Sequence, residues 1–279
     1  MKGKILLSLI FILVAGLAGT GYALATPSTG FYEKDGDVFD DWEISRTRAF
    51  GEDGFYQISE TTFRPVIAFE SLGENADIAY SLGEQIAAKY PDQIQRAEAI
   101  FVFVRNRVNY ISDIDQFDYD EFAQNADELA GMIEQDGVGY GDCEDSTVLL
   151  AVMYKGAGFR SAIAVGSGHT TALVYLPEYK KATALLELEG ETGWVWAEAT
   201  GKNNPLGWVP KEFINVNLAA YEITEEAIAT VEPPEAPSTA VAGTGGGGGG
   251  FSLPFPFFGM IFFLWFISSL FRGRRRRAR

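Results

Sequence analysis

The sequence is most informative in what it has only once: among 279 residues there is one cysteine, Cys143, and one histidine, His169. A single cysteine cannot form an internal disulfide, so the fold is not a disulfide scaffold. One cysteine and one histidine also exclude a zinc site, unless carboxylates supply the remaining ligands. A phosphate-binding glycine loop is absent as well. The thiol is therefore an inert buried group, an intermolecular linker or a nucleophile.

Basic residues are scarce outside the two ends of the chain. Eight of the 22 Lys and Arg lie in residues 1–25 and 272–279, so residues 26–250 carry 14 basic side chains against 38 acidic ones. Such a surface repels nucleic acid, which excludes DNA or RNA as a partner. It suits salty surroundings or bound divalent cations.

The two ends predict a protein that is exported and held at the membrane. Residues 1–25 read as a signal peptide, with Lys2 and Lys4 before an apolar stretch and a small-residue cleavage site at 23–25. The alternative is an uncleaved N-terminal anchor. No cysteine follows the apolar stretch, so a lipoprotein anchor is excluded.

The C-terminal end contains an uncharged segment, 251–271, followed by the basic tail 272–279. This order predicts a transmembrane helix with a cytoplasmic tail, hence a single-pass protein of the cell membrane whose bulk lies outside. A sorting signal that is cut and replaced by another anchor is the alternative, because six glycines precede the segment. Residues 221–250 are rich in Pro, Glu, Ala and Gly and predict a disordered stalk.

Residues 26–220 remain as one extracytoplasmic domain of ordinary size. Its first part is expected to contribute strands near 30–70, and the later apolar spacings predict helices followed by strands. Helices before strands favour an α+β domain, in which an antiparallel sheet packs on the helix that begins at Cys143. The expected helices are 75–90, 92–108, 127–135 and 143–155, and the expected strands are 161–165, 170–176, 183–189 and 193–200.

Cys143 is expected at the N-terminus of a helix, where free backbone N–H groups favour a thiolate. Asp142 is placed to cap that helix, with Asp145 as its partner three residues on. The negative charges of these carboxylates and of Glu144 disfavour a thiolate beside them, so a nearby imidazolium is needed to stabilise it. His169, at the start of a strand, is the candidate.

A third group must orient the imidazole, and Glu198 on a following strand is the leading candidate. Each of the three residues taken alone is more often structural. Together, the only cysteine and the only histidine at a suitable spacing favour nucleophilic catalysis.

Four stretches in order resemble the transglutaminase-like superfamily, which has a papain-like core: "AIFVFVRNRVNY", "GYGDCEDSTVLLAVMYKGAGFRSAIAVG", "GHTTALV" and "WVWAEAT". The resemblance implies Cys143 as nucleophile, His169 as general base and acid, Glu198 as orienter and Tyr110 as an oxyanion donor. The chain departs from the common pattern at Thr171, where many members have an aromatic residue. It also departs at 198–200, where many have Asp-Pro-Thr.

The "DCED" form resembles the bacterial and archaeal peptidase-like branch. This implies acyl transfer on amide bonds of an extracellular or envelope protein, with hydrolysis or cross-linking as the outcome. It also implies calcium near Asp142 and Glu144, against helix capping as the alternative. A catalytically inactive binding or scaffold module is the competing hypothesis. Neither acidic run, 33–41 or 113–122, has a glycine at the sixth position, as a calcium-binding EF-hand loop requires. The run 113–122 is predicted to be a solvated loop, and no other metal site is predicted.

Overall fold

The computed structural model describes residue 28 and residues 30–58, 63–72, 78–166, 168–224 and 238–243. The predicted signal peptide, membrane segment and basic tail lie outside the described residues. Over the part of the chain that is described, no helix has the length and apolar character needed to cross a membrane.

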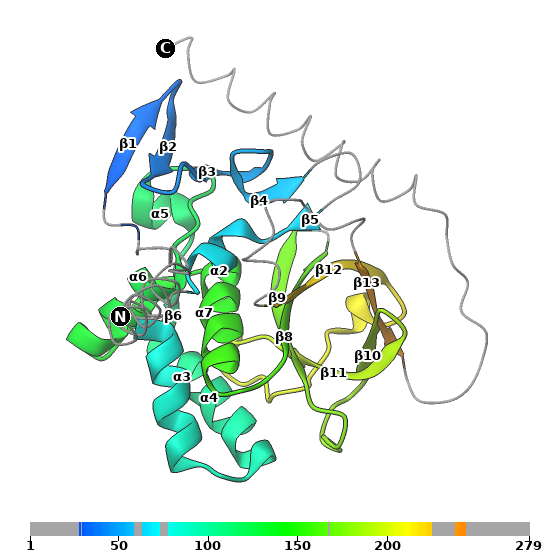
Figure 1. Cartoon of the computed structure of the whole chain (residues 1–279). Coiled ribbons are helices and arrows are strands. Elements are labelled where there is room, and N and C mark those ends of the chain that lie inside the picture. The colour runs from blue at the N-terminus through cyan, green and yellow to red at the C-terminus, as the bar shows by residue number, and fades with distance from the viewer. Residues whose placement is uncertain are drawn as a thin grey trace, which may run out of the picture.

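Helices form one half of the domain and surround α7, which starts at Cys143 (Figure 1). The four predicted helices are confirmed to within a few residues at their ends. Asp92 caps α4 by accepting the Gln95 N–H at 2.8 Å, and Asn125 forms a capping box with Glu128 at the start of α6. The helices are α2 (Val66–Glu70), α3 (Ile78–Lys89), α4 (Gln93–Arg107), α5 (Asp113–Phe117), α6 (Ala126–Asp136) and α7 (Cys143–Gly156).

The other half is an antiparallel sheet that closes into a barrel, in the order β10-β11-β9-β8-β12-β13 (Figure 1). The predicted α+β class and antiparallel sheet are therefore confirmed, and the closure adds two strands that were not expected. The strands are β8 (Ser161–Gly166), β9 (His169–Tyr175), β10 (Leu185–Leu188), β11 (Glu191–Ala197), β12 (Asn217–Ile223) and β13 (Ser238–Gly243).

The expected boundary between domain and stalk at residue 220 falls inside a strand. β12 continues to Ile223, where it pairs with Ser161 of β8, and residues 238–243 pair with both β10 and β12. Parts of the segment 221–250, which was interpreted as a disordered stalk, thus belong to the barrel. A strand whose backbone is paired on both sides can form from small and β-branched residues alone.

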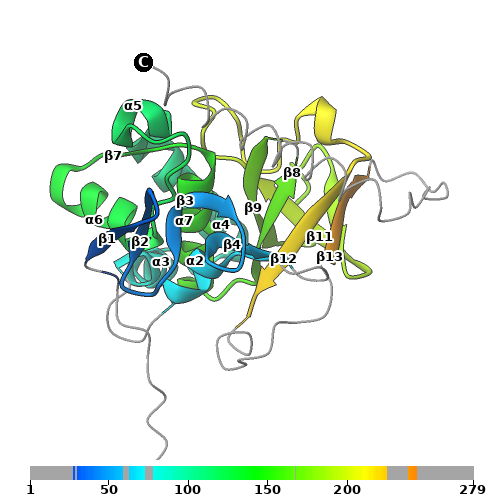
Figure 2. The same ribbon diagram turned by 90° about the horizontal axis from the view of Figure 1, so that it is seen from above.

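The N-terminal region forms a separate five-stranded sheet next to the helices, as Figure 2 shows from above. This confirms strands in the 30–70 region. A two-stranded parallel sheet completes the fold, in which β6 (Val108–Tyr110) pairs with β7 (Gly139–Gly141). The N-terminal strands are β1 (Phe31–Lys34), β2 (Asp37–Asp40), β3 (Ser45–Phe50), β4 (Gly54–Ile58) and β5 (Phe63–Arg64).

Helix α7 is the centre of the main hydrophobic core. Every residue from 144 to 154 is buried, so the helix is enclosed on all sides rather than on one stripe. Gly156 permits α3 to approach, because a Cβ at this position would overlap the backbone of Tyr80. Each fully buried Leu or Val contributes about 1.5–3 kcal/mol to folding. The start of α7 is therefore held rigidly relative to the sheet.

Candidate active site

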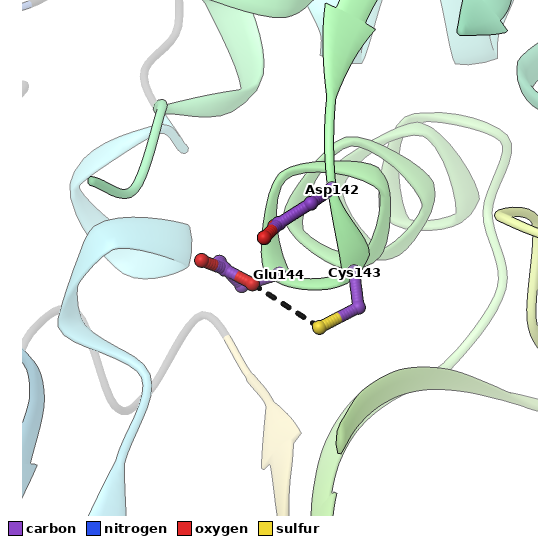
Figure 3. Close-up of side chains that lie close together, drawn as sticks. All are labelled: Asp142, Cys143 and Glu144. Atoms are coloured by element: carbon purple, nitrogen blue, oxygen red, sulfur yellow. Dashed lines mark hydrogen bonds between the residues drawn. The ribbon is translucent and has the colours of Figure 1, made fainter. Parts of the chain in front are cut away.

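Cys143 is the first residue of α7 and follows directly on strand β7 and Asp142 (Figure 3). Its side chain is half-buried, and the thiol donates a hydrogen bond to Glu144 Oε2 at 3.2 Å. The backbone N–H groups in the first turn of a helix have no partner within the helix, and they favour negative charge at this end. The predicted helix N-terminus at the thiol is confirmed.

Asp145 fixes the turn that carries Cys143. It is 1% exposed, and its carboxylate accepts the Asp142 N–H at 3.1 Å, which is the expected contact between these two residues. It also accepts the backbone N–H of Gln124 at 2.7 Å and the Gln124 side-chain amide at 2.8 Å. Both oxygens of Asp145 are therefore used in holding the turn.

His169 lies where β8 and β9 meet, paired with Gly166, and its ring contacts Glu198 just past the end of β11. The hydrogen bond joins His169 Nε2 to Glu198 Oε2. Cys143 and His169 line the same cavity, and the Cys143 side chain is close enough to raise the pKa of the imidazole. Since Nε2 faces the glutamate, Nδ1 is the ring nitrogen left for the sulfur. The structure thus brings together the three residues that the sequence singled out.

Thr200 holds Glu198 from the other side, and sequence reasoning missed this role. The Thr200 N–H donates to Glu198 Oε1 at 2.9 Å, and the Thr200 hydroxyl donates to the same oxygen. Glu198 is 7% exposed, and its pKa is lowered: burial opposes the shift, but the bonds from His169 and Thr200 outweigh it. The carboxylate therefore stays ionised and fixed beside the imidazole.

The charges around His169 favour its protonated form. Burial acts to lower the pKa of His169, but hydrogen bonds with Cys143 and Glu198 and the charges of both groups raise it to about 10. The histidine is thus an imidazolium at neutral pH when it faces a thiolate. This is the positive charge that the acidic surroundings of Cys143 require.

Two aromatic rings pack beside the imidazole. The His169 ring centroid lies 5.6 Å from that of Phe213 and 6.2 Å from that of Trp196, at interplanar angles of 27° and 21°. Gly166 makes room for this packing, because a Cβ there would lie 2.8 Å from the Phe213 ring. The stacking limits the rotation of the histidine.

A cavity of about 320 Å³ opens onto the thiol and the imidazole. Phe50, Phe55 and Tyr56 of the N-terminal sheet line one side, and Tyr110 is another lining residue. Tyr110 is 60% exposed and pairs through its backbone with Gly141, so it stands near the thiol, as expected. Tyr56 is buried and donates to the Thr170 hydroxyl at 3.3 Å; no pattern in the sequence pointed to it.

Carboxyl groups also line this cavity. Burial and the neighbouring charge of Asp142 raise the pKa of Asp113 to about 7, and burial with nearby carboxylates raises that of Glu121 to about 7 as well. The pKa of Glu144 is also raised well above its ordinary value, by burial first and then by the charge of Cys143.

The prediction of a solvated loop at 113–122 is wrong. Asp113 starts α5 and is 5% exposed, because its carboxylate accepts the Phe122 N–H at 2.7 Å. Among the residues that the structure describes, three groups of side chains place metal-ligating atoms within 4.8 Å of one another: Asp142, Cys143 and Glu144; Asp113, Asp142 and Asp145; Asp113, Glu121 and Glu144.

Comparison with known proteins agrees with this geometry. Residues 80–213 match the family model of the transglutaminase-like superfamily, a range that holds the thiol, the imidazole and the carboxylate described above. No curated protein matches the chain.

Proposed function

Because residues 80–213 form a transglutaminase-like superfamily domain, we propose that the chain is a cysteine peptidase or acyl transferase acting on protein amide bonds. The observation that carries the proposal is that Cys143 and His169 line one cavity, while Glu198 is hydrogen-bonded to the imidazole of His169. A buried structural cysteine would have neither the imidazole partner nor the access.

The first step is the transfer of the thiol proton to His169. The raised pKa of His169 favours the thiolate–imidazolium pair, and Glu198 keeps the Nε2 proton in place so that Nδ1 receives the proton from sulfur. Thr200 acts as a positioning residue, since it holds the carboxylate that orients the ring.

The thiolate then attacks the carbonyl carbon of the substrate amide. The negative charge on the carbonyl oxygen is met by the backbone N–H of Cys143 at the end of α7, with the hydroxyl of Tyr110 as the second donor. Imidazolium gives its proton to the leaving nitrogen as the C–N bond breaks. The acyl group remains on Cys143 as a thioester.

Water or an amine attacks the thioester, and His169 accepts its proton. The C–S bond breaks, sulfur leaves as thiolate, and the imidazolium is restored. Water gives hydrolysis and an amine gives cross-linking, through the same three residues. The substrate is an extracellular or envelope protein, since the proposal includes export by residues 1–25 and anchoring by residues 251–271.

Calcium near Asp142 and Glu144 is part of the proposal. Asp142 Oδ1 and Glu144 Oε1 are buried and have no hydrogen-bond partner among the described residues. Oxygen donors of this kind suit a hard cation, so these two residues fit calcium. Bound there, the ion would supply positive charge beside the first turn of α7.

The test is to incubate the purified full-length chain with envelope proteins, with and without a labelled amine, and to map the products by mass spectrometry. New termini or deamidated side chains indicate hydrolysis, and incorporation of the amine indicates transfer. Cys143→Ala is the control, and either product must vanish in it. Products that persist in Cys143→Ala would refute the mechanism.

A further inference from the structure

Large apolar side chains at the surface gather around the cavity that holds Cys143. Within the described ranges, eight large apolar side chains are exposed, and three of them line this cavity: Tyr110 is 60% exposed, Ile114 38% and Val216 38%. Phe50, which is half-buried, is a fourth lining residue. Exposed apolar side chains that gather in one hollow mark a binding surface, because each of them leaves water when a ligand covers it.

These four side chains come from segments that are far apart in the sequence. Phe50 ends β3, Tyr110 ends β6, Ile114 lies in α5, and Val216 immediately precedes β12. The cavity is therefore shared by the N-terminal sheet, the helical half and the barrel (Figure 1). Phe50 is supported by Tyr56, whose ring centroid lies 5.5 Å from its own. The family match covers residues 80–213, so Phe50 and Val216 lie outside it.

We propose that the acyl substrate is an extended segment of protein with large apolar side chains next to the reacting amide. This inference rests on the proposed acyl-transfer function and adds the class of substrate. A volume of about 320 Å³ is at the lower end of the range for ligand pockets, so the cavity admits a few side chains of an extended segment and no folded domain. Phe50, Ile114 and Val216 contact those side chains while the amide carbonyl lies at the sulfur of Cys143.

The carboxyl groups of the lining make a basic segment the alternative occupant. Asp113, Asp120 and Glu121 line the same cavity, and no lysine or arginine is among the lining residues that the structure describes. Charge attraction selects a basic side chain, whereas burial of apolar surface selects a large aliphatic one. The apolar segment is favoured because Ile114 and Val216 present more of their surface than Asp113, which is 5% exposed and already accepts the Phe122 N–H.

The experiment measures how fast peptide electrophiles label Cys143, so it needs no turnover. The purified full-length chain is treated with N-acetyl dipeptides of leucine, glycine or lysine, each ending in a chloromethyl ketone. The thiolate displaces chloride, so a C–S bond forms as the C–Cl bond breaks, and mass spectrometry follows the adduct. We expect the leucine probe to react about tenfold or more faster than the glycine probe, because burial of one apolar side chain has an effect of that size.

Val216→Ser removes one apolar contact, and Val102→Ser is the matched control. Both valines are 38% exposed, but Val102 lies in α4 and does not line the cavity. Val216→Ser and Ile114→Ser should each lower the preference for leucine over glycine by about threefold or more, the effect of about one buried methylene group. Val102→Ser should leave the preference unchanged. Iodoacetamide carries no such side chain and should label Cys143 at the same rate in all four proteins.

Three results would overturn the proposal. The first is equal labelling of the wild-type chain by the leucine and glycine probes. The second is a lysine probe as fast as the leucine probe, because charge would then govern binding. The third is an unchanged preference in both Val216→Ser and Ile114→Ser. Iodoacetamide labelling that does not depend on His169 would instead refute the proposed acyl-transfer mechanism, so the two failures are distinguishable.

Discussion

Replacement of Glu198 by Gln tests whether the carboxylate orients His169. The carboxylate offers two acceptor oxygens, of which one contacts His169 Nε2 and the other accepts two bonds from Thr200. An amide has only one acceptor. Whichever way Gln turns, either the imidazole N–H or the Thr200 N–H faces an NH₂ group and loses its partner.

The magnitude follows from these contacts. One buried donor without a partner costs about 1–3 kcal/mol of stability. Activity should fall by about 10²–10⁴-fold, which corresponds to about 3–5 kcal/mol in the barrier, because the histidine is no longer held in the productive tautomer. The loss should be smaller than in Cys143→Ala. Glu191→Gln, a change at the start of β11, is the control. It should alter activity by less than twofold and the free energy of unfolding by less than about 0.4 kcal/mol.

The same variant changes the pH dependence of stability. The folded-state pKa of His169, about 10, is above its ordinary value of 6.5, so protonation of His169 stabilises the folded protein. This contribution is fully present below about pH 6.5 and is lost as the pH rises through about 10. Without the charge of Glu198 the pKa of His169 should fall, and the contribution should be smaller and end at lower pH.

The assay is NMR of the imidazole, which gives a single titration curve because the chain has one histidine. The wild-type midpoint should lie near 10 and that of Glu198→Gln clearly lower. Equal midpoints in the two proteins would refute the reasoning.

Three further changes test other parts of the structure. Cys143→Ala should abolish turnover yet change the free energy of unfolding by less than about 1 kcal/mol, measured in urea, because the side chain is half-buried and small. Gly166→Ala should destabilise by about 1–3 kcal/mol and reduce turnover, since its Cβ meets the Phe213 ring at 2.8 Å; wild-type turnover and unfolding would contradict this. Arg46→Met should cost about 3–5 kcal/mol in the same unfolding assay, because it leaves the buried carboxylate of Asp40 unpaired; a loss below about 1 kcal/mol would show that the pair is dispensable.

The helices and the order of the site residues could be predicted from the sequence because both depend on local patterns. The apolar run after Cys143, closed by glycines, specifies a buried helix with the thiol at its start, and α7 ends within a residue of the expectation. The strand carrying His169 followed from alternation of side chains. Glu198 was expected on a strand over 193–200, but β11 ends at Ala197 and the carboxylate lies one residue beyond it.

The closure of the barrel could not be predicted, because it depends on pairing between strands distant in sequence. Residues 238–243 have no alternation of polar and apolar residues, and their strand exists only through its partners β10 and β12. The prediction of a solvated loop at 113–122 failed for the same reason. Alternating acids indicate a solvated loop, but Asp113 is buried by a tertiary contact with the Phe122 backbone. The role of Thr200 could not be predicted, because it depends on the orientation of the Glu198 side chain, whose Oε1 accepts its hydrogen bonds.

The most direct measurement of the central claim is the alkylation rate of Cys143, the only thiol, in the wild-type chain and in His169→Ala. If the two side chains act as one unit, His169→Ala should slow reaction with iodoacetamide at pH 6 by about tenfold or more, since the thiolate loses its positive partner. The difference should shrink towards pH 9. Equal rates for both proteins at pH 6 would contradict the account.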